Sequence, residues 1–530
     1  GTCSGTLTSY GPLAITSLGA SSASPITRAV SLEAGQMKPY SFTVPAGATS
    51  LEVRLDNRVG NPAINLVAGS RIPASGSYGS EGGQTGASTN SSAITMVAPA
   101  AGTYTVLVRC APIIGPAEPY LASSGNLVVT AKTAAALSFN GGVTSVTNQA
   151  ANAWNFYQVT VPATAGIMGW DLMVRNVTGN GTPKIVVRRD LVPTFLGTTS
   201  SWNDPDAATS WPSGNSLMAP LVDWTQRPYD VSGGVYTRSR RLVMAMGAPL
   251  EPGTYYVGIL NDGTAACSYT LESRGIGASQ SIAVEALAFP SGSNVNITNL
   301  APRQVNYRKV TIPAQTRSWE VLASEVTGEM SMFVRYGKIP TITGGYQCVK
   351  TGSERFVMMP ADGQDYLAEG DYYVAVVSEG FNPPDSQTVG ASTIGMFLRS
   401  NGELAVGDLG EVSTSPVSQP VTLQAGQISA YQFTIPQGLT NLSLRLDNVT
   451  GGAQIHLNRG TRLPRPDLFS NTNSGYGGGQ TTAVSHGNTV SLNNPVAGTY
   501  TLDIRGTAYT TAASGTLVIT PSMPLPPEPL

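Results

Sequence analysis

The histidines are the first residues of this chain to consider for catalysis, and only two are present, His456 and His486. A zinc peptidase usually carries an HExxH pair, and a serine hydrolase a GxSxG elbow with matched histidine and aspartate partners. Neither arrangement is found. We therefore expect no catalytic residue, no metal site and no enzyme activity in this chain.

A second group of candidates lies in one aromatic and acidic segment, residues 200–236. Four aspartates there could act as the paired carboxylates of a glycoside hydrolase, which needs no histidine: Asp204, Asp206, Asp223 and Asp230. Exposed aromatic rings can also stack on sugars, which makes five rings candidate ligand-binding residues: Trp202, Trp211, Trp224, Tyr229 and Tyr236. The alternative, which the length of the segment favours, is a long loop that buries its own tryptophans.

The four cysteines are Cys3, Cys110, Cys267 and Cys348. None belongs to a CxxC pair, which argues against a zinc knuckle. An even number at wide spacing suits two disulfides in an oxidising compartment. Of the three ways of pairing them, Cys3–Cys110 and Cys267–Cys348 are favoured because each would tie neighbouring regions. The alternative is four buried free thiols.

Composition excludes several classes of partner. Charged residues make up 12% of the 530 residues and the formal net charge is -2, so the chain lacks the basic field that nucleic-acid binding requires. No apolar run approaches the roughly 20 residues of a membrane span. A neutral surface rich in Gly, Ser and Thr is typical of short strands joined by many turns.

The chain repeats itself. Residues 32–73 and 423–464 align without a gap, as in "AGQMKPYSFTVPAGATSLEVRLDN" and "AGQISAYQFTIPQGLTNLSLRLDN". Two divergent copies lie between them, with "NFYQVTVP" and "PGTYYVGI" in the second and "NYRKVTIP" and "EGDYYVAVV" in the third. His456 stands where the first copy has Asn65, which predicts a solvent-facing strand position. Arg54 and Asp56, repeated as Arg445 and Asp447, predict a surface ion pair.

Each phrase alternates with a period of two, which indicates strands. Tyr40, Phe42 and Val44 share one face while Ser41 and Thr43 share the other. We therefore predict an all-β chain of four tandem antiparallel β-sandwich, jelly-roll-like domains forming an elongated rod. The predicted boundaries are an extended arm (1–25), sandwiches at 26–132, 133–277, 278–402 and 403–520, and a Pro-rich tail (521–530).

These phrases resemble the bacterial pre-peptidase C-terminal domain family. The first and fourth copies carry its strand motifs as "YSFTVP", "LEVRL" and "AGTYTV" or their equivalents, whereas the third has Arg308 at the tyrosine position and Asp371 in place of the threonine. The resemblance implies small modules of secreted bacterial proteins, often beside a peptidase. Some relatives bind calcium through an acidic turn, but the turn here, "NRVGNPA", lacks acidic residues, so we expect no cofactor.

The expected function is that of a non-catalytic, extracellular or cell-surface structural or adhesive protein, such as a stalk, surface-layer or filament subunit. The N-terminal arm is the expected assembly element, with Leu13, Ile15 and Leu18 adding to a neighbour's sheet edge. The expected partners are further copies of the chain or neighbouring cell-surface proteins. The alternatives are a carbohydrate- or protein-binding accessory array, or the non-catalytic part of a larger secreted hydrolase.

Overall fold

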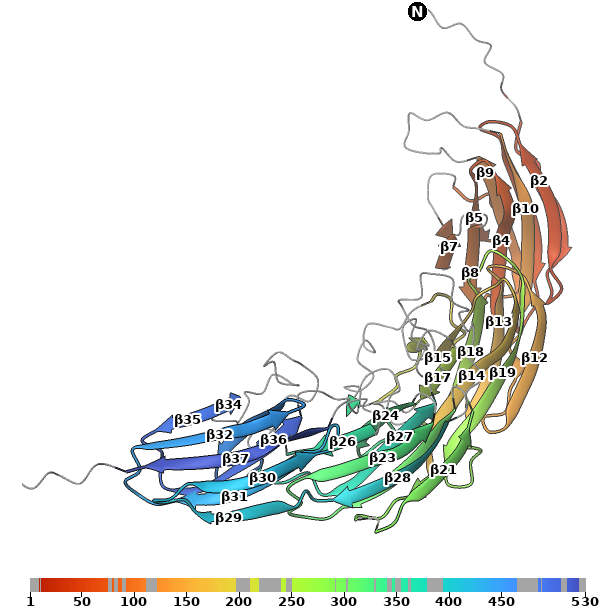
Figure 1. Cartoon of the computed structure of the whole chain (residues 1–530). Helices are drawn as coiled ribbons and strands as arrows, with labels where there is room; N and C mark the ends of the chain where they lie inside the picture. The colour runs from red at the N-terminus through yellow and green to blue at the C-terminus, as the bar shows by residue number, and fades with distance from the viewer. Residues whose placement is uncertain are drawn as a thin grey trace, which may run out of the picture. The chain divides into compact units, whose positions relative to one another are not determined.

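The computed structural model describes residues 9, 11–74, 79–80, 84–87, 92–110, 122–196, 210–218, 240–244, 250–290, 292–301, 304–327, 330–340, 346–347, 354–360, 364–378, 394–464, 485–487, 489–506 and 512–523. Every regular element within these ranges is a β-strand. The strands form eight sheets, which we group into four pairs with a repeated strand order (Figure 1). The prediction of an all-β chain is confirmed.

The first two pairs belong to the N-terminal half. In the order in which they are hydrogen bonded, the strands of pair 1 are β1 (Thr16–Ala20), β3 (Met37–Val44), β9 (Gly102–Cys110), β5 (Pro62–Ala68) and β6 (Gly79–Ser80), and then β2 (Ile26–Leu32), β10 (Ser123–Lys132), β4 (Ser50–Val59), β8 (Ser92–Val97) and β7 (Gln84–Ala87). Those of pair 2 are β11 (Ala135–Ala136), β13 (Trp154–Val161), β18 (Gly253–Asn261), β15 (Pro183–Arg189) and β16 (Ser216–Met218), and then β12 (Gly142–Gln149), β19 (Cys267–Gly277), β14 (Ile167–Gly179) and β17 (Arg240–Met244).

The other two pairs repeat this order. The strands of pair 3 are β20 (Val284–Ala286), β22 (Val305–Ile312), β27 (Gly370–Ser378), β24 (Met330–Tyr336) and β25 (Tyr346–Gln347), and then β21 (Val295–Leu300), β28 (Ile394–Gly402), β23 (Trp319–Thr327) and β26 (Glu354–Met358). Those of pair 4 are β29 (Val406–Glu411), β31 (Ile428–Ile435), β36 (Gly498–Gly506), β33 (Ala453–Arg459) and β34 (Ser485–Gly487), and then β30 (Val417–Leu423), β37 (Ala513–Ser522), β32 (Asn441–Thr450) and β35 (Thr489–Asn493).

The alternating residues of the repeated phrases form the core between the two sheets of a pair. In pair 1, Phe42 and Val44 of β3 face Val53 and Leu55 of β4, and all four are at most 1% exposed. Pairs 3 and 4 bury equivalent clusters. Because successive side chains of a strand point to opposite faces, the same strands carry a second, outer set of side chains.

The tyrosine of the repeated "GTY" phrase, which reads "GDY" in pair 3, makes the same hydrogen bond in every pair. Its hydroxyl donates a hydrogen bond to the main-chain oxygen four residues earlier, at 2.9–3.1 Å: Tyr104 to Ala100, Tyr255 to Glu251, Tyr372 to Ala368 and Tyr500 to Val496. This is similar to the tyrosine corner known from β-sandwiches, in which a buried ring fixes the chain that leads into its strand. The phrase is therefore repeated for a structural reason.

Two core positions separate the inner pairs from the outer pairs. Trp170 and Trp319 stand where pairs 1 and 4 have Leu51 and Leu442, and all of these side chains are fully buried. Each indole needs a partner for its N–H group when it is buried. Trp170 donates to the Ser273 hydroxyl at 2.8 Å, and Trp319 donates to the Ser400 hydroxyl at 2.9 Å.

The described residues form two compact units, one that ends at Ser281 and one that begins at Ile282. Each unit contains two sheet pairs that share buried contacts. In this respect a unit resembles a solenoid, whose neighbouring repeats pack on one another, more than two separate sandwiches. Lys132, Gly277 and Gly402, where the sequence placed three domain ends, are the last residues of β10, β19 and β28.

The predicted N-terminal arm is in part a strand of pair 1, which corrects the interpretation of residues 1–25 as a free extension. β1 pairs in parallel with β3, just as β11, β20 and β29 pair with the equivalent strands of the other pairs. Leu18 packs against the core of pair 1. We call β1, β11, β20 and β29 the leading strands.

The tyrosine corner predicts a matched pair of stability changes in pair 3. Tyr372→Phe removes a hydroxyl that is bonded to Ala368 and should lower the free energy of unfolding by roughly 1 kcal/mol. Tyr366→Phe, at a side chain that is 44% exposed, is the control and should leave it unchanged. Urea denaturation of the full chain measures both, and equal effects of the two changes would contradict the role of the corner.

Buried tyrosines also predict a loss of stability in alkali. Burial raises the pKa of Tyr255 to about 12 and that of Tyr372 to about 12, whereas an unfolded tyrosine ionises near pH ~10. Their contribution is therefore complete below the unfolded pKa and is lost as the pH rises from about 10 to about 12. Urea denaturation at a series of pH values should show this fall. The fall should be smaller for the Tyr255→Phe, Tyr372→Phe double variant, and an equal fall in both chains would contradict the assignment.

Candidate functional site at the junctions between sheet pairs

The junction between pairs 1 and 2 starts with an ion-paired cluster on the outer face of β4. Arg54 Nη1 lies 2.6 Å from Glu52 Oε1, and Arg54 Nη2 lies 3.0 Å from Asp56 Oδ2. Glu52 is 2% exposed and Arg54 is 5% exposed. The prediction of a surface ion pair is therefore wrong for Arg54, because a second sheet pair packs against this part of β4.

Pair 1 holds the main chain of pair 2 through this cluster. The N–H group of Trp154, the first residue of β13, donates to Glu52 Oε2 at 3.1 Å. The ammonium group of Lys132, the last residue of β10, donates to the main-chain oxygen of the same Trp154. Burial lowers the pKa of Lys132, although Glu52 opposes this shift. Burial also acts to lower the pKa of Arg54, but Glu52 and Asp56 outweigh it and raise that pKa.

Apolar side chains pack around these polar contacts. Val97, at the end of β8 in pair 1, packs against a cluster of pair 2 that contains Trp154, Phe156 and Val192. Ala134, which precedes the leading strand β11, joins the same cluster. The junction therefore combines a buried acid, main-chain hydrogen bonds and an apolar contact, which together fix the order and register of the two pairs.

The junction between pairs 3 and 4 is built from the equivalent elements. Glu320 of β23 is ion-paired with Arg355 of β26, and both side chains are buried. Val357 and Met359 of pair 3 pack against Ile428, Ala430 and Leu463 of pair 4. Leu404 and Val406, at the entry to the leading strand β29, complete this cluster.

One position on the β4-type strand carries the acid of both described junctions, Glu52 and Glu320. It follows the first buried core residue of the strand and is occupied by Glu52, Asp171, Glu320 and Ser443 in the four pairs. Asp171 is fully buried and accepts a hydrogen bond from Arg274 Nε at 3.0 Å. Sequence reasoning missed this position, although the acid that follows Leu51, Trp170 or Trp319 was a visible signal for it.

The aromatic residues predicted to bind a ligand are only partly described. Trp202, Trp224, Tyr229 and Tyr236 lie outside the residues that the structure describes. Trp211 is 1% exposed, its ring centroid lies 4.9 Å from that of Tyr255, and its Nε1 donates to the oxygen of Asn215 at 3.1 Å. Trp211 is therefore a core residue of pair 2 and cannot present a stacking surface, which corrects its assignment as a ligand-binding residue.

The cysteines give a second correction. Cys110 is a buried free thiol whose Sγ donates to the main-chain oxygen of Glu33 at 3.1 Å, so it is not half of the predicted Cys3–Cys110 disulfide. Its position in the core of pair 1 leaves it surrounded by apolar side chains. Cys267 is buried at the start of β19. Cys348 and Cys3 lie outside the described residues. Cys267 forms no disulfide, so the predicted Cys267–Cys348 pairing is not found either.

His456 is buried rather than solvent-facing, which corrects the predicted solvent-facing position. Its Nδ1 lies 2.9 Å from Asp503 Oδ1, and Arg505 Nε donates to the same oxygen at 3.2 Å. Burial alone would raise the pKa of Asp503, but Arg505 and His456 hold it below its usual value. With His456 9% exposed and Asp503 fully buried, this cluster stabilises the face of the sheet and does not present a reactive group to solvent. His486 belongs to β34, which pairs with β33, and its side chain is not described.

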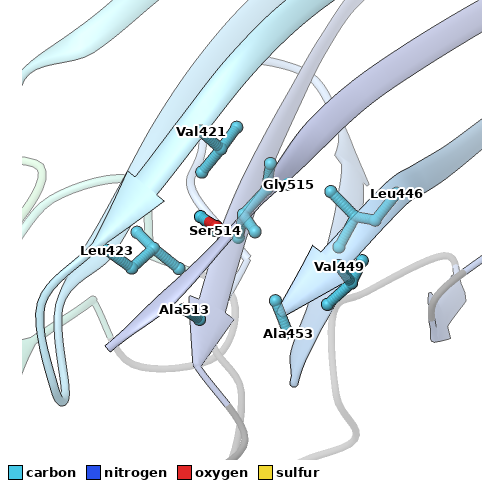
Figure 2. A pocket seen from close by; sticks show the side chains of 9 residues that line it. Val421, Leu423, Leu446, Val449, Ala453, Ala513, Ser514 and Gly515 are labelled. Atoms are coloured by element: carbon cyan, nitrogen blue, oxygen red, sulfur yellow. The ribbon is translucent and has the colours of Figure 1, made fainter. Parts of the chain in front are cut away.

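A cavity with no room for a water molecule lies at one end of pair 4 (Figure 2). Its lining is almost entirely apolar and includes Leu423, Leu446 and Val449. The one hydroxyl in the lining, that of Ser514, is bonded to Thr450 at 2.7 Å. Pockets that bind small molecules usually measure roughly 300–1,000 Å³ and carry several polar anchors. This cavity therefore does not qualify as a ligand site.

Two further features are absent from the described residues. No group of three or more His, Cys, Asp or Glu side chains is placed there to hold a metal ion. Among the same residues, no helix is long and apolar enough to cross a membrane.

Comparison with known proteins identifies one domain. Residues 39–109 match the family described as bacterial pre-peptidase C-terminal domain, and this stretch includes β3 to β9 of pair 1. No curated protein sequence matches the chain. One similar solved structure is the crystal structure of dimeric latent PorU from Porphyromonas gingivalis, with 11% identity and a TM-score of 0.14 over 74% of this chain. The match covers 35% of that chain.

The buried acid of the first junction predicts a large stability change. Glu52→Ala leaves the Trp154 N–H group without its acceptor and Arg54 with one carboxylate fewer, and should lower the free energy of unfolding by roughly 3 kcal/mol. Ser443→Ala, at the same position of β32, is the matched control and should change it by less than about 0.5 kcal/mol. Urea denaturation of the full chain measures both. A Glu52→Ala effect as small as that of the control would contradict the junction.

Proposed function

We propose that this chain is a non-catalytic structural array of a secreted or cell-surface bacterial protein, built from four tandem β-sandwich repeats of the pre-peptidase C-terminal type. The observation that carries the proposal is the junction, in which Glu52 and Lys132 of one pair hold the main chain of Trp154 in the next. A contact of this kind fixes successive modules in one relation. Fixed modules suit a protein that spaces or supports other groups.

The family match supports the location. The matched domain family is found in secreted proteases and their propeptide regions, and pair 1 contains the match at residues 39–109. Pairs 2 to 4 share the strand order and the tyrosine corner of pair 1, which supports a common origin for all four. The low proportion of charged residues, 12%, also suits an extracellular module.

The buried polar clusters support a role without catalysis. Glu52, Asp171, Glu320 and Asp503 each lie in a buried ion pair. A general acid or base must reach its substrate within hydrogen-bond distance, and these carboxylates are at most 6% exposed. Their role is to stabilise the fold through these ion pairs.

A second candidate function is the non-catalytic part of a larger secreted hydrolase, which the family match favours. A third, recognition of a glycan or protein by residues 200–236, has lost one of its five rings because Trp211 is in the core. Both candidates share the prediction that the 530-residue chain is inactive by itself.

Electron microscopy and immunoblotting of native material test the proposal. An antibody raised against the purified chain should label the cell surface or extracellular assemblies, and the purified chain should not hydrolyse proteins or polysaccharides. Hydrolysis that copurifies with the chain through successive columns would contradict the structural role. An antigen found only on a larger protein with hydrolase activity would support the second candidate instead.

A further inference from the structure

The entry to pair 1 corresponds, residue by residue, to the entries of pairs 2 and 4. Thr16 is paired with Tyr40, Ala135 with Tyr157, and Gly407 with Tyr431. A leucine follows two residues later in each leading strand or directly after it, at Leu18, Leu137 and Leu409. The positions three and five residues before that leucine are therefore equivalent: Ile15, Ala134 and Val406 for the first, and Leu13, Lys132 and Leu404 for the second.

In both described junctions, between pairs 1 and 2 and between pairs 3 and 4, the residues at these two positions take part in the contact between the pairs. Ala134, at the entry to pair 2, packs in the cluster that contains Val97 of pair 1. Lys132, at the other position, is the last residue of β10 and donates across the junction to Trp154. In pair 4, Leu404 and Val406 pack in the cluster that contains Val357 and Met359 of pair 3. The residues that enter a leading strand thus form the front half of a junction.

In pair 1 the same two positions are apolar and exposed. Leu13 is 47% exposed and Ile15 is 38% exposed. The neighbouring leading strand β1 is hydrogen bonded to β3, and Leu18 is anchored in the core. We call Leu13 and Ile15 the front patch. The equivalent residues of pairs 2 and 4 pack against the preceding sheet pair. The two described junctions therefore indicate which kind of surface would cover the front patch.

The other half of a junction, which we call the rear edge, differs between the pairs. It consists of the acid on the β4-type strand, the residue paired with it on the β8-type strand and the residue two positions further on. These residues are Glu52, Thr95 and Val97 in pair 1 and Glu320, Val357 and Met359 in pair 3. In pair 4 they are Ser443, Ser491 and Asn493.

The rear edge of pair 4 is therefore polar. Ser491 and Asn493 are exposed, and the amide oxygen of Asn493 accepts a hydrogen bond from Asn441 Nδ2 at 2.9 Å. It offers no acid to a main-chain N–H group and no apolar side chain to Leu13 and Ile15. A second copy of this chain is thus a poor occupant of the front patch.

We propose that the front patch is a docking surface for the rear edge of a β-sandwich module other than pair 4 of this chain, one that presents an acidic residue beside apolar residues as pairs 1 and 3 do. This inference goes beyond a structural role because it specifies which face associates and the chemistry of its partner. It also changes the predicted use of the arm: Leu13 and Ile15 form a packed junction instead of donating a strand.

The test installs the rear edge of pair 3 on pair 4 of the full chain, by Ser443→Glu, Ser491→Val and Asn493→Met together. Sedimentation velocity should then show a mass that rises with protein concentration, because the new edge fits the front patch of another copy. The unchanged chain should not associate through the front patch, so its mass should be the same at all concentrations. Adding Leu13→Lys and Ile15→Lys to the triple variant should restore the single mass.

Controls separate association from misfolding. Leu13→Lys and Ile15→Lys alone should leave the circular dichroism spectrum and the melting temperature unchanged, since both side chains are exposed. If the triple variant loses its folded spectrum, the double variant Ser491→Val and Asn493→Met, at two exposed positions, replaces it with the same readouts.

Two results would overturn the inference. A folded variant that keeps a single mass at every concentration would show that the front patch is not half of a junction. Association of the unchanged chain that Leu13→Lys and Ile15→Lys abolish would show that the polar edge of pair 4 is the partner after all, and would overturn the choice of occupant.

Discussion

The main chain of Trp154 is held at both of its polar groups by side chains of the preceding sheet pair, the N–H group by Glu52 and the oxygen by Lys132. Burying a charged side chain is costly unless it finds a charged or hydrogen-bonding partner. Glu52 and Arg54 are partners within β4, but Glu52 Oε2 and the ammonium group of Lys132 bond to Trp154 only when the second pair is in place. The contacts to Trp154 therefore depend on correct packing, and a shifted arrangement would deprive Glu52 Oε2 and Lys132 of this partner.

The same residue types have different roles in different pairs, and the neighbouring pair decides which. Arg54 and Arg445 both form an ion pair with an aspartate two residues later. Arg54 is buried at a junction, whereas the side chain of Arg445 is 46% exposed. A surface pair such as Arg445–Asp447 contributes little to stability, and a buried cluster is sensitive to the loss of any member. Stability in such an array is a sum of repeat terms and neighbour terms.

The sequence predicts the elements of this fold well where the pattern is local. The alternation of Tyr40, Phe42 and Val44 and the order of the repeated phrases lead directly to the strands and to their grouping. Burial on the outer face of β4 depends on the neighbouring module, so Arg54 was expected at the surface. The N-terminal segment was expected to form a strand, but its partner was wrong: β1 pairs with β3 of its own chain instead of a neighbour's sheet edge. Trp211 shows the same limit, since its partner Tyr255 lies far along the chain.

The replacement of leucine by tryptophan in the inner pairs gives the protein built-in optical labels. Of the six tryptophans, five lie between Trp154 and Trp224, and Trp319 is the sixth. Pairs 1 and 4 contain none, so each compact unit joins one fluorescent pair to one that is silent in tryptophan emission. In the unit that begins at Ile282, the emission of Trp319 reports the surroundings of a single buried indole bonded to Ser400. In a variant that keeps Trp319 alone, the loss of structure around pair 3 is therefore readable without attaching any dye.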